Sequence, residues 1–125
     1  MAKVTGIGGI FFKSDNPEKT AKWYRDALGL GFENMGGDTQ YVQFKLHDFA
    51  GPVFSIFDRN SDYMDPSAKD VMINLMVDNV AEALEQVRAH GGQIVGDIKS
   101  EVYGDFGWFI DPEGRKIELW SPAKP

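Results

Sequence analysis

The chain has 125 residues, of which 42% are hydrophobic and 26% charged, a composition typical of a single globular domain. Its 19 acidic and 13 basic side chains give a formal charge of -6, and no cluster of Lys or Arg interrupts this balance. Such a chain repels nucleic-acid phosphates, so no nucleic-acid partner is expected. No apolar run reaches the roughly 18 residues that cross a bilayer, and the N-terminus lacks the apolar stretch of a secretory signal. We therefore expect no membrane partner and a cytoplasmic location.

The first half of the chain is predicted to form a strand, a helix and three more strands. Residues 4–13 (VTGIGGIFFK) have the composition of a strand. Asp15 and Asn16, followed by Pro17, are typical of a helix start, and Gly29 is typical of a helix end. The three further strands are expected over residues 30–36, 40–47 and 52–58.

The second half is predicted to repeat this order after a polar segment. Residues 59–69 include a proline and show no hydrophobic periodicity, so we interpret them as a linker. A strand over residues 70–77 and a helix over residues 79–90, capped by Asp78 or Asn79, are expected next. The last three strands are expected over residues 93–99, 102–110 and 115–121.

The sequence also matches itself when it is shifted by 63 residues. Between Gly9 and Phe57 seven positions are identical to their shifted partners, among them the cap pair Asp15-Asn16 and Asp78-Asn79. The identities fall at helix starts, helix ends and turns, without any change of offset. A fixed spacing of this kind predicts one supersecondary unit used twice, here two βαβββ modules over residues 4–58 and 70–121 of a single domain.

Alternation along the paired strands separates two faces of the predicted sheet. Ile10, Ile56, Ile73 and Leu119 belong to a set that is apolar throughout, which is expected of the face beneath the helices. The opposite set mixes aromatic rings, thioethers, an amide and charges. A face of that composition suits the lining of a cup that holds a small molecule.

Two segments resemble a known family. They are Gly8-Gly9-Ile10-Phe11-Phe12 with Trp23–Leu30, and Trp108–Trp120, which contains Asp111-Pro112-Glu113-Gly114 before Ile117-Glu118-Leu119. Together with the tandem modules they resemble the vicinal oxygen chelate superfamily, which includes glyoxalase I, the fosfomycin and bleomycin resistance proteins, and extradiol dioxygenases. The resemblance implies an α+β fold of tandem βαβββ modules forming cup-shaped mixed sheets, and a homodimer.

The resemblance also implies a divalent metal held at four strand positions, which in this sequence are Gly9, Ser55, Met72 and Glu118. Only Glu118 is a good ligand for a hard divalent ion, because glycine has no side chain and a thioether is too soft. The chain lacks cysteine, and both histidines, His47 and His90, lie elsewhere in the sequence. We therefore expect neither a metal nor another cofactor.

Glu118 remains as the candidate for chemistry. It is interpreted as an acid neutralised by Lys116 or Lys13, as a contact for a ligand amine or hydroxyl, or as a general base whose pKa burial raises. Phe11, Phe57, Trp108 and Trp120 are candidates for stacking on a flat ligand, although core packing is the commoner role of strand aromatics. The full set of predicted ligand contacts is Phe11, Lys13, Ser55, Phe57, Met72, Asn74, Trp108, Lys116, Glu118 and Trp120.

The function predicted from the sequence is a metal-free, glyoxalase- or bleomycin-resistance-like protein that binds a small, partly aromatic organic molecule in its cup. One alternative is an enzyme, a lyase, isomerase or dioxygenase, that uses a metal on Glu118 with further ligands or acid–base work by Glu118 alone. A third interpretation is an accessory module whose cup is filled by apolar side chains and whose surface serves a partner protein. Whether the chain is an enzyme is left open at this stage.

Overall fold

The structure is a computed structural model that describes residues 1–45 and 51–123. The elements of the first half are β1 (Val4–Ser14), α1 (Pro17–Leu28), β2 (Glu33–Gly36), β3 (Thr39–Gln43) and β4 (Val53–Asp58). The elements of the second half are β5 (Val71–Val77), α2 (Val80–Ala89), β6 (Gln93–Glu101), β7 (Gly104–Ile110) and β8 (Lys116–Pro122). The two helices begin 63 residues apart, at Pro17 and Val80, and so do the last strands of the two halves, at Val53 and Lys116.

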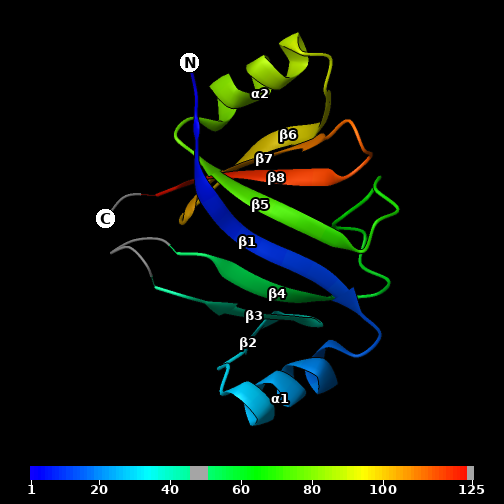
Figure 1. Ribbon diagram of the computed structural model, residues 1–125. Coiled ribbons are helices and arrows are strands. Elements are labelled where there is room, and N and C mark those ends of the chain that lie inside the picture. Colours follow the sequence, from blue (N-terminus) through cyan, green and yellow to red (C-terminus); the bar gives the residue numbers. More distant parts are fainter. Residues whose placement is uncertain (46–50, 124–125) are drawn as a thin grey trace.

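The strands form one sheet in the order β2-β3-β4-β1-β5-β8-β7-β6 (Figure 1). Within each half the first and last strands are parallel, β1 with β4 and β5 with β8. The halves join in the centre, where β1 runs antiparallel to β5 and Ile10 pairs with Ile73. The predicted α+β fold with a mixed sheet is confirmed, and the two modules pair within one chain.

Capping residues determine where both helices begin. The side chain of Asn16 accepts a hydrogen bond from Lys19 N at 3.0 Å, and Asn79 accepts one from Glu82 N at 2.9 Å. The chain leaves α1 at Gly29, whose φ of 71° lies in the left-handed region that glycine adopts without strain. Neither helix of the described residues is long and apolar enough to span a membrane.

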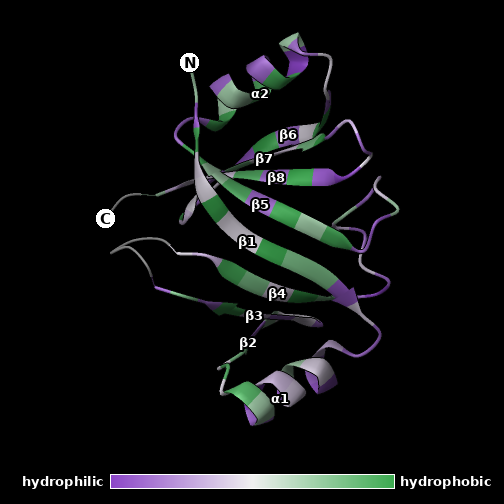
Figure 2. Ribbon diagram, in the orientation of Figure 1, coloured by the Kyte–Doolittle hydropathy of each residue, from purple (hydrophilic) through white to green (hydrophobic). Residues whose placement is uncertain are grey.

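The helices cover the two ends of one face of the sheet and leave β1 and β5 between them (Figure 1). Beneath α1, Ala21 packs with Phe32 and Ile56. Beneath α2, Leu84 packs with Leu119 in a second cluster. Figure 2 shows that hydrophobic residues are frequent along the four central strands, β4, β1, β5 and β8. The apolar set recognised by alternation therefore lies on the helix side.

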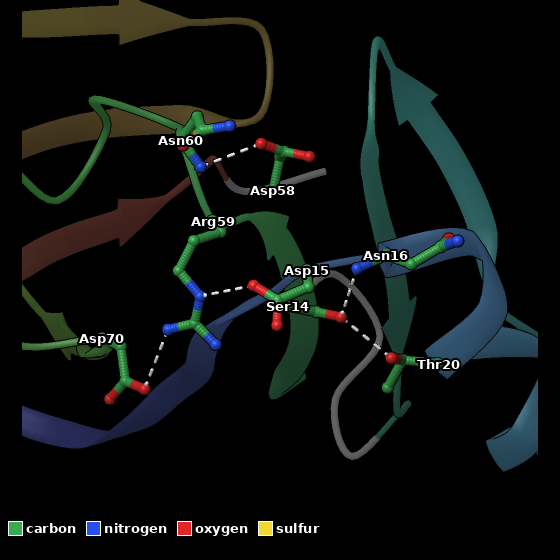
Figure 3. Close-up of polar contacts among 8 residues, drawn as sticks. All are labelled: Ser14, Asp15, Asn16, Thr20, Asp58, Arg59, Asn60 and Asp70. Atoms are coloured by element: carbon green, nitrogen blue, oxygen red, sulfur yellow. Dashed lines mark hydrogen bonds and ion pairs between the residues drawn. The ribbon is translucent and has the colours of Figure 1, made fainter.

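The opposite face carries a separate cluster, composed of Phe11, Phe57, Met64, Met72 and Trp108. Met64 belongs to the segment 59–69, which thus packs on the open face of the sheet rather than passing it by. The start of this segment is held by Arg59, whose Nε lies 3.0 Å from Asp15 Oδ1 and whose Nη1 lies 3.4 Å from Asp70 Oδ2 (Figure 3). Because these ion pairs are exposed, they contribute little to stability, and the buried Met64 is the stronger anchor.

Candidate functional site

The open face of the sheet contains a cavity of about 790 Å³. Both halves of the chain line it, β3 and β4 from one side and β7 and β8 from the other. Ser55, Asn74 and Glu118 lie at its floor and are almost completely buried, whereas Lys99 and Glu101 of β6 are exposed. The volume is in the range of ordinary small-molecule sites.

Glu118 is the centre of a hydrogen-bonded group at this floor. Its Oε1 accepts from Asn74 Nδ2 at 2.6 Å, and its Oε2 accepts from Trp108 Nε1 at 2.8 Å and from the hydroxyl of Tyr63. All three partners are donors, which is the arrangement that an ionised carboxylate requires. Burial nevertheless raises the pKa of Glu118 above its ordinary value. The three hydrogen bonds act in the opposite direction, but their effect on the pKa is smaller than that of burial.

The lysines do not neutralise this carboxylate by direct contact. Lys116 Nζ donates to the carbonyl oxygen of Tyr63 at 2.6 Å and lies 5.4 Å and 5.7 Å from the ring centroids of Tyr63 and Trp108. Burial lowers the pKa of Lys116. Lys13 lies near the end of β1, where it pairs with Phe57. Within residues 1–45 and 51–123, Glu118 forms no ion pair.

Aromatic rings form the wall above the floor. The rings of Phe57 and Tyr63 stack with centroids 5.3 Å apart, and Tyr63 meets Trp108 edge-on at 6.2 Å. Phe106 stacks on Trp108 at 6.5 Å and on Trp120 at 6.0 Å. Each ring is thereby fixed by its neighbours, so the wall is largely rigid before any ligand enters.

Asn74 has one buried polar atom without a partner. Its Nδ2 is used by Glu118, but its Oδ1 has no hydrogen-bond partner in the part of the chain that the structure describes. Gly8, at a register shift in β1, makes room for this oxygen, since a Cβ at Gly8 would lie 2.0 Å from it. Gly8 therefore accommodates the amide of Asn74 at the floor of the cup.

The structure brings most of the predicted contacts together. Seven of them line the cavity, namely Phe11, Ser55, Phe57, Asn74, Trp108, Glu118 and Trp120. Three do not line it: Met72 lies inside the apolar cluster, Lys116 lies behind Tyr63 and Trp108, and Lys13 lies at the end of β1. His90 lies at the end of α2, where its Nδ1 contacts Gln86 O at 2.9 Å. His47 lies outside the described residues.

Sequence reasoning missed Tyr63. It lies in the segment interpreted as a linker, yet it hydrogen-bonds Glu118, stacks on Phe57 and lines the cavity. The available signal was small: Tyr63 and Met64 are the two large apolar side chains in an otherwise polar run.

The residues at the floor do not fit a divalent metal. Gly8 and Gly9 offer no side chain, Met72 is packed among aromatic rings, and Glu118 already holds three neutral donors. Among the described residues there is no group of three His, Asp or Glu side chains that could hold an ion. With His47 outside these residues, the expected absence of a metal stays a prediction.

A cup-shaped mixed sheet built from two βαβββ halves is the architecture of the vicinal oxygen chelate superfamily. The model of the glyoxalase-like domain family matches residues 9–120, and the chain belongs to that family. The resemblance found in the sequence is confirmed. No curated protein matches the chain in sequence.

Solved structures agree on the fold. A methylmalonyl-CoA epimerase of Streptomyces coelicolor, in complex with 2-nitronate-propionyl-CoA, is similar with a TM-score of 0.72 and 15% identity, over 98% of this chain and 100% of that one. The methylmalonyl-CoA epimerase of Mycobacterium tuberculosis has a TM-score of 0.66 and 16% identity, and the match covers 97% of this chain and 90% of that one. A Mn(II)-bound glyoxalase from Novosphingobium aromaticivorans has a TM-score of 0.68 and 19% identity, and the match covers 97% of this chain and 40% of that one. Because the sequence identities are this low, the similarity to these structures shows that they share the fold and nothing more.

Proposed function

We propose that this protein binds a small, partly aromatic organic molecule in its cup, without a metal ion. The observation that carries the proposal is the cavity of about 790 Å³, with a wall of stacked aromatic rings and one hydrogen-bonded carboxylate at its floor. Flat apolar surfaces with a few fixed polar groups are what small-molecule sites share. An accessory module would have a cup filled by large apolar side chains. Here the side chains leave the volume of the cup open.

Binding should be detectable with a library of small aromatic compounds, by saturation-transfer NMR on the purified protein. Thr39 lines the cavity from β3, so Thr39→Trp should fill part of it and weaken binding by roughly tenfold or more. Lys22→Trp, on the exposed surface of α1, adds the same side chain away from the cup and should leave binding unchanged. If no compound binds, or if Thr39→Trp and wild type bind equally, the proposal is wrong.

One observation favours a second function, acid–base catalysis by Glu118. Burial raises the pKa of this carboxylate, as is common for general bases. Against it, both carboxylate oxygens hold donors and only 2% of the residue is exposed. A carboxylate this deeply buried, with three donors already bound to it, is poorly placed to remove a proton from a substrate, so ligand binding remains the better-supported function.

We propose, in addition, that the protein is a homodimer formed through the uncovered strip of β1 and β5. Val4, Ile7, Ile10 and Val71 are each 42–56% exposed on the helix side, between α1 and α2. Because β5 is the repeat of β1 and runs antiparallel beside it, the strip has nearly the same shape from either end. A second copy of the chain can therefore place the same apolar strip against it in a two-fold arrangement.

Ile10→Lys should convert this dimer to a monomer, because it places a charge in the middle of the apolar strip. Light scattering coupled to gel filtration should give twice the 14.0 kDa chain mass for wild type and the single mass for the variant. Ile98→Lys changes another exposed isoleucine, on β6, and should remain dimeric. A wild type that is monomeric at all concentrations, or a dimeric Ile10→Lys, would contradict the assignment.

A further inference from the structure

We propose that the cup selects ligands whose polar head is a protonated amine and whose body is aromatic. This inference rests on the proposed function, because it names the class of molecule that the cup binds. Three features of the described residues support it: the balance of charge around the cavity, the acceptors at the floor, and the aromatic faces of the wall.

The charges around the cavity favour a cation. Of the residues that line it, Lys99 is basic, whereas Glu101 and Glu118 are acidic. Lys116 lies behind the wall, and its charge is offset by Asp62 and Asp65 as well as by Glu118. The carboxylate of Glu118 is surrounded by neutral donors rather than by a counter-ion, so no direct ion pair cancels its attraction for a cation in the cup.

The floor offers acceptors, and the three donors around Glu118 are already used. The hydroxyl of Tyr63, the indole N–H of Trp108 and Nδ2 of Asn74 all donate to Glu118. What remains is one acceptor position on Glu118 Oε1, which receives a single donor, and the unpartnered Oδ1 of Asn74. Leaving a buried acceptor unpaired is unfavourable, and a donor brought by a ligand removes that penalty.

The wall suits the same head group. Aromatic faces attract an ammonium ion placed within about 6 Å of the ring centroid. Lys116, which does not line the cavity, already makes two such contacts with Tyr63 and Trp108, so these rings accept a cation. An anionic ligand would meet Glu101 and Glu118, and among the described residues that line the cavity Lys99 is the one cationic side chain. A phosphate-rich ligand, such as the coenzyme A ester in the epimerase complex, is therefore poorly complemented here.

Three probes of one shape separate these possibilities: 2-naphthylmethylamine, 2-naphthylmethanol and 2-naphthoate, which are cationic, neutral and anionic at neutral pH. Titration of wild type, followed by tryptophan fluorescence and calorimetry, should give the tightest binding for the amine, by roughly tenfold over the alcohol, and the weakest for the carboxylate. Equal binding of all three, or tightest binding of the carboxylate, overturns the inference but leaves the proposed function standing. Binding of none of them, with no binder in the compound library, overturns both.

A charge-neutral variant tests the source of the selectivity. Glu118→Gln should reduce the preference for the amine over the alcohol from about tenfold to less than about threefold, while the alcohol still binds. Glu113→Gln, in the exposed turn between β7 and β8, removes one acidic charge elsewhere and should keep the full preference. Circular dichroism checks that both variants are folded. A folded Glu118→Gln protein that keeps the full preference would contradict the role given to the floor carboxylate.

Discussion

Met64→Ala should lower the free energy of unfolding by about 2–5 kcal/mol, the range typical of a buried methionine cut to alanine. Met64 is completely buried, in contact with the cluster that includes Phe11, Phe57, Met72 and Trp108. Its removal leaves a cavity under the segment 59–69, and that segment also carries Tyr63. The variant should therefore weaken ligand binding as well, because the hydroxyl of Tyr63 loses its fixed position beside Glu118.

Met35→Ala is the matched control. It makes the same substitution at a methionine of β2 that is 57% exposed, so the change in unfolding free energy should stay within about 0.5 kcal/mol. Urea unfolding of the three proteins gives the comparison. Should the two variants prove equally stable, the segment 59–69 would be a plain connection, and Tyr63 would have no firm anchor.

The predictable part of the site comes from regular strands. Alternation assigns Ser55 and Glu118 to one face and Ile56 and Leu119 to the other, and the repeat supplies each assignment twice. Strand alternation, with its period of two residues, and the internal repeat, with its offset of 63 residues, are independent signals. Their agreement determines on which face of the sheet each of these side chains lies. The structure accordingly places Ser55 and Glu118 at the cavity floor and packs Ile56 and Leu119 beneath the helices.

The unpredictable part comes from contacts that no local pattern records. Tyr63 and Met64 lie in a segment without periodicity, and their positions are set only by the tertiary contacts with Phe57, Trp108 and Glu118. The partners of Glu118 were misjudged for a related reason. Lysines on the same or a facing strand are the simple choice for a carboxylate, whereas the structure supplies neutral donors, Asn74 among them, because Lys116 bonds a backbone carbonyl instead.

Glu118→Gln should change how stability depends on pH. Burial raises the pKa of Glu118 in the folded state above the ordinary value of 4.5, so the folded chain binds this proton more tightly than the unfolded chain does. The favourable contribution of the protonated acid is complete below pH 4.5 and is lost as the pH rises through the folded-state pKa. Glutamine does not titrate. The variant should therefore gain stability relative to wild type as the pH rises, by at most about 1.4 kcal/mol for each pH unit.

Urea unfolding of both proteins between pH 4.5 and neutral pH measures this difference, since titrating groups that do not interact with Glu118 contribute equally to both. The lost hydrogen bonds add a constant offset, because the amide nitrogen of glutamine cannot accept from Trp108 or Tyr63. Glu113→Gln, at an exposed turn, should give a difference that does not vary with pH. A flat difference for Glu118→Gln would mean that the fold leaves this pKa unchanged, and an opposite slope would mean that the three donors outweigh burial. If the slope is as expected, ionisation of Glu118 destabilises the protein with an empty cup, and the same ionised form attracts a cationic ligand. A bound amine should therefore increase the free energy of unfolding most at the pH values where Glu118 is charged.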